Sequence, residues 1–327
     1  MSFRVFHSLE EARDVAGPAA VTIGNFDGVH RGHQMLFAQV EDAGRVNGWA
    51  STALTFAPHP ARILKPEKAP RLLSTLEQRL GWMREAGLDQ AVVLPFTREL
   101  SELAPEEFVR QILIEALDTR LVVVGDNFRF GRRAAGDIGT LQEMGRQFGF
   151  KTSIVCGLTV RGVAVSSSEI RALIEAGRVA RAGRLLGRPY GLSGEVVAGH
   201  GIGRTQTVPT LNLKTAAEIL PAAGVYVTSV SDLESGLRWA SVTNIGFRPT
   251  FGGQEFSIES FVLSSFAEPA PARIRVEFHH RLREERAFPD AGALKAQILR
   301  DVARAQAWHR RAGAWTNRPA KASFIAS

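Results

Sequence analysis

The alternation of short apolar segments with amphipathic ones constrains the fold of the first half of this chain most strongly. A segment such as Leu121-Val122-Val123-Val124 is apolar throughout, which is typical of a strand covered on both faces. Alternating strand and helix patterns of this kind predict an α/β domain with a Rossmann-like, doubly wound parallel sheet. We expect strands at 20–24, 51–56, 90–95, 120–125 and 151–156, and helices at 33–43, 76–86, 105–117 and 138–148.

The periodicity changes after Gly187, where strand-like segments follow one another without helices between them. Residues 273–278 alternate strictly between polar and apolar, so one face of that strand is expected to be buried and the other wet. Turns rich in Gly and Pro separate the segments, which predicts a small antiparallel β-barrel. The expected strands lie at 190–198, 208–213, 224–230, 239–245, 256–263 and 273–278.

One helix is expected to close the barrel domain. Asp290 is its expected N-cap, and Leu294, Ile298, Leu299 and Val302 form its expected apolar stripe. The domains are therefore expected at residues 1–184 and 185–315, followed by a tail at 316–327.

Composition narrows the class of protein. The chain has 327 residues, more than one hydrophobic core usually organises, so two domains are the first expectation. A single cysteine, Cys156, excludes an internal disulfide and a Cys-x-x-Cys metal site, and favours a reducing, cytoplasmic location. No signal peptide or membrane span is expected, because no apolar run has the necessary length.

The net charge of +7 leaves two classes of partner open, nucleic acid and polyanionic small molecules. The basic residues are mostly scattered arginines, and their densest cluster lies at 171–188 on expected helices. Nucleoside triphosphates account for such a surplus as well as nucleic acid does, so charge alone does not decide between them.

The loop after the first expected strand is the clearest candidate site. It reads Gly-Asn-Phe-Asp-Gly-Val-His-Arg-Gly-His over residues 24–33, where the dinucleotide fingerprint and the P-loop are both absent. Glycines let the backbone approach a ligand, and the start of the following helix favours phosphate. His30 and His33 are placed to donate hydrogen bonds to phosphate oxygens, as transfer of an adenylyl group requires. The alternative is that both histidines are surface residues on a turn.

Two more segments belong with this loop. Residues 125–131, which include Asn127, end the fourth expected strand at the edge where open α/β sheets bind ligands. Residues 166–171 begin a helix in which Ser166 and Glu169 form a possible capping box. A capped helix start can still bind phosphate, and Arg171 would then reach the β- and γ-phosphates of a nucleotide.

A second candidate site lies in the barrel. A glycine-rich segment containing Gly199, Gly201 and Gly203 is followed by Thr210 and Asn212, which share a strand face. Their side-chain oxygens could share Mg²⁺ with ATP phosphates, although ordinary turn chemistry explains the pattern too.

Glu259 is the candidate base of this second site. Strand alternation places Glu259 on the same face as Phe261 and Leu263. A carboxylate among apolar neighbours tends to have a raised pKa, which suits a group that accepts a hydroxyl proton. The alternative is that this strand face is the wet one.

Taken together, these segments resemble the prokaryotic bifunctional riboflavin kinase/FMN adenylyltransferase family, also called FAD synthetases. The resemblance covers nearly the whole chain and rests on segments that occur in the family's order: IGNFDGVHRGH, FAPHP, LPFTREL, GDNFRFG, SSSEIR, LLGRPY, GRTQTVPTLNL, NIGFRPTFGG and VEFHHRLREE.

The resemblance implies that the barrel phosphorylates riboflavin with ATP to give FMN, and that the first domain adenylylates FMN to give FAD and pyrophosphate. Mg²⁺ would accompany ATP, and the flavins would be substrates or products, not prosthetic groups. No nucleic-acid or membrane partner is implied. By position, Glu259 matches the kinase base, Thr210 and Asn212 its Mg-ATP pair, and Gly199, Gly201 and Gly203 its nucleotide loop. The transferase positions are His30 and His33 with Gly24, Asn25, Phe26, Asp27, Gly28, Asn127, Ser167, Ser168 and Arg171.

The chain departs from the family's pattern mainly in the kinase half. Val208 and Leu211 stand where the family usually has Phe and Ala, and Asn127 stands where many members have Asp. Two other classes of function are open on the residues alone. One is a single-activity nucleotidyltransferase acting on another acceptor, and the other is a non-catalytic module that binds flavin or nucleic acid.

Overall fold

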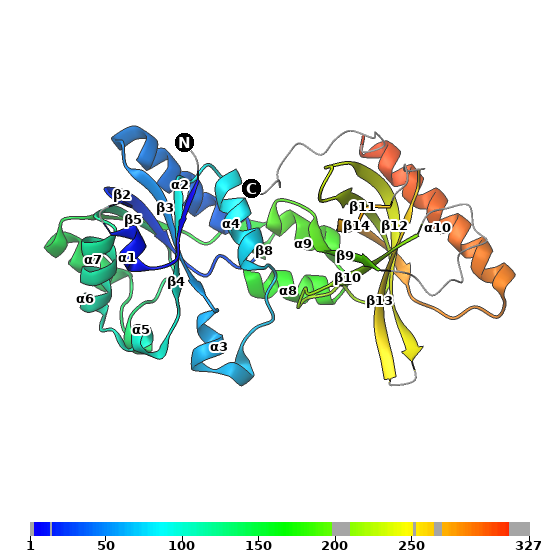
Figure 1. The fold of residues 1–327 in the computed structure, drawn as a ribbon, viewed down its shortest axis with the longest axis horizontal. Coiled ribbons are helices and arrows are strands. Elements are labelled where there is room, and N and C mark those ends of the chain that lie inside the picture. Colours follow the sequence, from blue (N-terminus) through cyan, green and yellow to red (C-terminus); the bar gives the residue numbers. More distant parts are fainter. Residues whose placement is uncertain (1–2, 14, 198–209, 251–252, 265–269, 314–327) are drawn as a thin grey trace. The chain divides into compact units, whose positions relative to one another are not determined.

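The computed structural model describes residues 3–13, 15–197, 210–250, 253–264 and 270–313. The chain forms two compact units, Met1–Ser167 and Ser168–Ser327 (Figure 1). Each unit is described by itself below.

The first unit is built on a six-stranded sheet with every strand pair parallel. The strand order is β1-β4-β3-β2-β5-β6, and all five residues of β2 are buried. The five expected strands are confirmed, whereas the edge strand β1 was not expected because it has three residues, of which one is buried. The strands are β1 (Arg4–Phe6), β2 (Ala19–Ile23), β3 (Ala50–Ala57), β4 (Gln90–Pro95), β5 (Thr119–Gly125) and β6 (Lys151–Val155).

Helices and short turns connect these strands, and the four expected helices are present. The expected helix at 105–117 begins as α6 and continues as π-helical turns, η2. The connections are α1 (Leu9–Ala12), α2 (Arg31–Asn47), α3 (Pro60–Leu64), η1 (Pro66–Lys68), α4 (Leu76–Glu85), α5 (Arg98–Glu102), α6 (Pro105–Phe108), η2 (Val109–Ala116), η3 (Arg132–Ala134), α7 (Ile138–Phe148), and the small pair β7 (Thr159–Val160) and β8 (Val163–Ala164).

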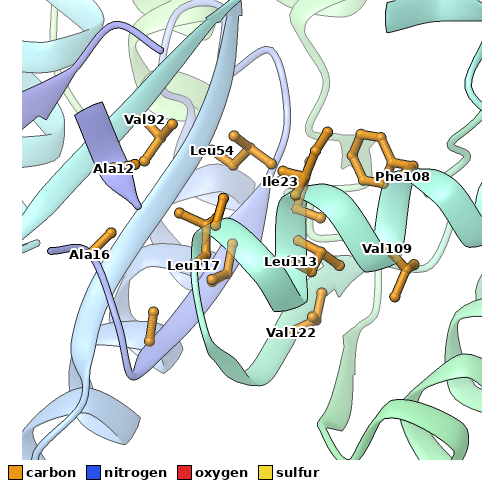
Figure 2. Close-up of a cluster of buried hydrophobic side chains, with 14 of the residues drawn as sticks. Ala12, Ala16, Ile23, Leu54, Val92, Phe108, Val109, Leu113, Leu117 and Val122 are labelled. Atoms are coloured by element: carbon orange, nitrogen blue, oxygen red, sulfur yellow. The ribbon is translucent and has the colours of Figure 1, made fainter. Parts of the chain in front are cut away.

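The main core of this unit lies between the sheet and the helix formed by α6 and η2 (Figure 2). Leu113 of η2 and Leu117, the C-cap of η2, pack with Ile23 and Leu54 from the central strands, and all four are buried. Removing such a side chain costs about 2–5 kcal/mol, so this layer fixes the sheet on which the first candidate site is built.

The strand order determines where that site can form. From β2 the chain winds to β3 and β4 on one side, whereas β5 pairs with the other side of β2. The carboxyl ends of β2 and β5 therefore form a topological switch point, the place where open parallel sheets bind ligands. The loop at 24–30 follows β2 and the segment at 126–131 follows β5, so the two expected segments meet at this edge.

The second unit contains a closed antiparallel barrel in the order β10-β13-β12-β11-β14-β9, which confirms the expected architecture. The interior holds apolar side chains together with hydroxyls, including a hydrogen-bonded series from Ser241 through Thr228 and Thr243 to Ser260. The elements are α8 (Ser167–Glu175), which starts at the end of the first unit, α9 (Val179–Leu186), β9 (Tyr190–Val197), β10 (Thr210–Thr215), β11 (Gly224–Asp232), β12 (Arg238–Thr250), β13 (Gly253–Val262), β14 (Arg273–Glu284) and α10 (Ala291–Arg311).

The closing helix α10 begins as expected but buries a different face. Asp290 is its N-cap, because its Oδ1 accepts a hydrogen bond from the N–H of Ala293 at 2.8 Å. The expected apolar stripe is wrong: Leu294 and Leu299 are 42% and 61% exposed. The buried residues instead recur every fourth position, at Gln297, Asp301, Ala305 and His309.

Irregularities in the barrel explain this polar face. The register between β11 and β14 shifts twice, and each shift frees backbone groups from the strand ladder. At the shift beside His279, Nε2 of His309 hydrogen-bonds the carbonyl oxygen of Thr228 at 3.0 Å. Near the other shift, Asp301 accepts a hydrogen bond from Nε of Arg283 at 2.8 Å. The helix packs here through polar groups that the barrel presents, which hydrophobic periodicity cannot reveal.

Two histidines at the contact between α10 and the barrel, the half-buried His279 of β14 and the buried His309 of α10, predict an acid-sensitive barrel. His279 stacks on Trp308 with ring centroids 4.9 Å apart, hydrogen-bonds Ser229, and has its pKa lowered to about 3 by burial and by Arg238 and His309. Burial lowers the pKa of His309 too. Because an unfolded histidine titrates near 6.5, the unfolded state binds more protons between about pH 6.5 and 3, and the barrel loses stability as the pH falls through that window.

Denaturant unfolding of the barrel, followed by tryptophan fluorescence at pH 7.5 and 5, measures this loss. We expect His279→Gln to reduce the difference between the two pH values, and His280→Gln, an exposed neighbour on the same strand, to leave it unchanged. If the unfolding free energies of both variants depend equally on pH, His279 is not the source of the acid sensitivity.

Candidate functional sites

The loop between β2 and α2 is shaped by its own histidines. His30 is the N-cap of α2, with its Nδ1 accepting a hydrogen bond from the N–H of His33 at 3.3 Å. The two rings stack with centroids 3.6 Å apart. A Cβ on Gly32 would lie 3.2 Å from the His30 ring, and Gly28 has a φ of +77°, so glycine suits both positions.

This cap determines which ring nitrogen of a neutral His30 carries the proton. Because Nδ1 accepts a hydrogen bond, a neutral His30 carries its proton on Nε2, which is then the donor. His30 is only 7% exposed, so the interpretation of these histidines as surface residues on a turn is wrong for His30. Among the described residues, the N–H groups of Arg31 and Gly32 make no hydrogen bond, as expected of a helix start that can receive an anion.

Asp27 holds the loop against the segment before α4. Its carboxylate, 4% exposed, accepts hydrogen bonds from the N–H groups of Leu73 and Ser74 and from the Ser74 hydroxyl, at 3.0–3.2 Å. The same hydroxyl accepts a hydrogen bond from the N–H of Gly28 at 2.8 Å. The carboxylate thus has a structural task, and a contact between Asp27 and a nucleotide stays a prediction. Ser74 was missed because nothing in its local pattern distinguishes it from a turn residue.

The structure shows fewer contacts for the other expected transferase residues. The Ser167 hydroxyl donates a hydrogen bond to the carbonyl oxygen of Asp27 at 2.9 Å, which brings the first residue of α8 to the loop. Asn127 is exposed just after β5, at the same sheet edge. Ser168 and Arg171 follow on α8 in the second unit, so their roles at this loop stay predictions. Gly24, Asn25 and Phe26 form the start of the loop, where the N–H of Gly24 bonds Leu54.

The second candidate site is a polar row on the outer face of the barrel. In the antiparallel register Asn212 of β10 is the partner of Glu259 of β13, and Thr210 is the partner of Phe261. Thr210 and Asn212 therefore share one face, as expected, and the register adds Glu259 to that face. Directly opposed side chains have Cβ atoms about 5 Å apart, so an oxygen of Asn212 and the Glu259 carboxylate can act on one ligand.

The face that carries Glu259 is neither the barrel interior nor an open surface. Glu259 is half-buried, and Val242 and Val225 on the same face are packed beneath Ala305 of α10. Ile258, Ser260 and Val262 on the opposite face of β13 are buried, so Glu259 lies on the more exposed of the two faces, as the wet-face interpretation expects, although that face is partly covered. Asn244 of β12 is the register partner of Glu259 on its other side, so Glu259 is flanked by an asparagine on each neighbouring strand. Strand alternation could have identified Asn244, which lies two residues after Val242 on the same face of β12.

Gly199, Gly201 and Gly203 lie outside the described residues, so their role in the kinase loop stays a prediction. No helix among the described residues is long and apolar enough to cross a bilayer.

Comparison with known proteins identifies a relative for each unit. Residues 12–169 match the family model described as FAD synthetase, and residues 186–309 match the one described as riboflavin kinase. A bifunctional riboflavin kinase/FMN adenylyltransferase of Escherichia coli strain K12 is 34% identical over 299 residues, covering 91% of this chain and 94% of the relative. One from Pseudomonas fluorescens is 38% identical and covers 88% and 91%.

A solved structure has the same architecture. A crystal structure described as a macrolide-efflux protein from Streptococcus pneumoniae matches with a TM-score of 0.82 and 26% identity, covering 94% of this chain and all of the other. The likeness extends over both units.

Proposed function

Because the chain belongs to the bifunctional riboflavin kinase/FMN adenylyltransferase family, it converts riboflavin to FMN and FMN to FAD, and we propose how its residues divide this work. The loop of His30 and His33 serves the adenylylation, and the barrel row of Thr210, Asn212 and Glu259 serves the phosphorylation. The observation that carries this assignment is the presence of two separate polar sites, one in each unit. The first is held by the His30 cap of α2, and the second by the register between β10 and β13.

At the loop, a phosphate oxygen of FMN attacks the α-phosphorus of ATP, the new P–O bond forms, and pyrophosphate leaves with the electrons of the broken bond. Such a reaction needs positioned donors more than a nucleophilic side chain. The Nε2–H of His30 and the N–H groups at the start of α2 supply donors, and the α2 dipole favours the added negative charge. His33 supports His30 through the stacked ring and its N–H.

At the barrel, a ribityl hydroxyl oxygen of riboflavin attacks the γ-phosphorus of ATP and ADP leaves. Glu259 accepts the hydroxyl proton, and Asn212 and Asn244 on the neighbouring strands hold its carboxylate in place. Both reactions use ATP with a divalent metal. Thr210 and Asn212 carry oxygen ligands of the kind that Mg²⁺ prefers, so they would hold the ion together with ATP. When bound, Mg²⁺ neutralises phosphate charge.

The remaining assignments follow from this division. The boundary between the two catalytic domains lies at 184–185. The two compact units divide earlier, at 167–168, because α8 and α9 are grouped there with the barrel. Riboflavin, FMN and ATP are the partners, the flavins pass through as substrate and product, and the enzyme works in the cytoplasm without a nucleic-acid or membrane partner. The positive net charge then serves phosphate-bearing substrates.

A direct assay tests the proposal. The protein is incubated with riboflavin, ATP and Mg²⁺, and the flavins are separated by chromatography. FMN should form first and FAD should follow, and chelation of the metal should stop FMN formation. Unchanged riboflavin in the presence of metal would refute the kinase assignment, and FMN without FAD would refute the transferase assignment.

A further inference from the structure

A buried arginine lies behind the adenylyltransferase loop. Arg79 of α4 is 5% exposed, and its Nη1 donates a hydrogen bond of 2.6 Å to the carbonyl oxygen of Asn25 in the loop. The same nitrogen lies 3.3 Å from the Thr55 hydroxyl, which is itself 3.4 Å from that carbonyl. Two groups from two different elements therefore converge on one peptide of the loop.

Keeping a charge at this position costs stability. Burial lowers the pKa of Arg79 from its ordinary value, and the negative charge of Asp27 partly opposes that shift. Its Nε is buried and has no hydrogen-bond partner within the described residues. An apolar side chain would avoid both penalties, so packing alone does not explain an arginine here.

The peptide that Arg79 holds has a donor on its other side. The peptide between Asn25 and Phe26 is trans, so the N–H of Phe26 points away from the carbonyl that Arg79 fixes. Phe26 is 1% exposed and has a φ of +50°, and within the described residues its N–H makes no hydrogen bond. A buried N–H without a partner is rare in folded proteins, so this one is a candidate donor to a bound ligand. A nucleotide phosphate is the chemistry that suits it.

We propose that Arg79 is a positioning residue of the adenylyltransferase: its guanidinium fixes the Asn25–Phe26 peptide so that the N–H of Phe26 faces the phosphates of bound ATP. Arg79 itself does not touch the substrate. This inference rests on the proposed function of the loop. This role of Arg79 could not be predicted from the sequence, because Arg79 is one of many scattered arginines on expected helices.

The test uses the full chain and measures kcat and KM for FMN adenylylation, with the kinase reaction of the same molecule as an internal reference. Arg79→Met keeps the apolar stem and removes the donors, and we expect kcat to fall about 10²-fold with a smaller change in the KM for ATP. Arg79→Lys keeps a charge and one donor and should recover part of that loss. Arg84→Met, on an exposed position of the same helix, is the matched control and should leave kcat unchanged.

A merely structural role gives a different pattern. Arg79→Met would then lower the unfolding temperature while kcat per folded molecule stays within about twofold of the parent, and Lys would rescue nothing; either result overturns the proposal. If Arg79→Met does not fold, Arg79→Lys and Thr55→Val test the proposal instead. Both should lower kcat for FMN adenylylation without lowering the kinase rate. An unmodified chain that makes no FAD from FMN refutes the proposed function instead, because that result does not depend on Arg79.

Discussion

Glu259→Gln is expected to abolish the conversion of riboflavin to FMN while the conversion of supplied FMN to FAD continues. Glutamine keeps the size of the side chain and its place between Asn212 and Asn244, but it cannot accept the hydroxyl proton. Loss of a positioned base costs about 10²- to 10⁴-fold in rate. Initial rates of FMN formation, measured by chromatography at saturating ATP, give the size of the effect.

Glu195→Gln is the matched control for this prediction. Glu195 is an exposed carboxylate on β9, a neighbouring strand of the same barrel, and removing its charge should leave both reactions at parental rates. A rate of FMN formation by Glu259→Gln within about threefold of the parent would show that another group accepts the proton.

His30→Asn is expected to have the opposite effect, with adenylylation of FMN lost and phosphorylation of riboflavin retained. Asparagine is a good N-cap, so it can still accept the hydrogen bond from the N–H of His33 and keep the start of α2 intact. It lacks the Nε2–H donor that His30 directs from the cap. Removal of one such donor costs about 10²–10³ in kcat, which steady-state rates of FAD formation would show.

His7→Asn serves as the control, since His7 is exposed at the start of the chain and takes no part in the loop. The comparison separates capping from catalysis. If His30→Asn keeps its rate whereas His30→Ala loses it, the histidine acts as a cap alone and the donor role is wrong.

The sequence predicts most of the fold because its apolar segments have a clear period. The runs at 90–95 and 138–148 agree with β4 and α7 to the residue, since each is bounded by turn signals and covered on its apolar face. Alternation likewise placed Thr210 and Asn212 on one face of their strand, and the register adds that Glu259 of the neighbouring strand lies on the same face.

The rest depends on contacts between distant residues. The buried face of α10 follows from two register shifts in β14, and no local pattern encodes a shift. The tasks of Asp27 and Arg79 arise where residues about 46 and 54 positions apart meet. The roles of the expected ligand contacts at Asn127, Ser168 and Arg171 remain predictions, because the described geometry does not bring a substrate to them.

The central claim is that one chain carries two independent sites, and a complementation assay tests it most directly. Glu259→Gln and His30→Asn are each incubated with riboflavin, ATP and Mg²⁺, alone and mixed in equal amounts, and FAD is measured by chromatography. Each variant alone should make almost no FAD, and the mixture should make it readily, because FMN released by one protein is adenylylated by the other. A mixture that makes no more FAD than the separate variants would contradict the claim.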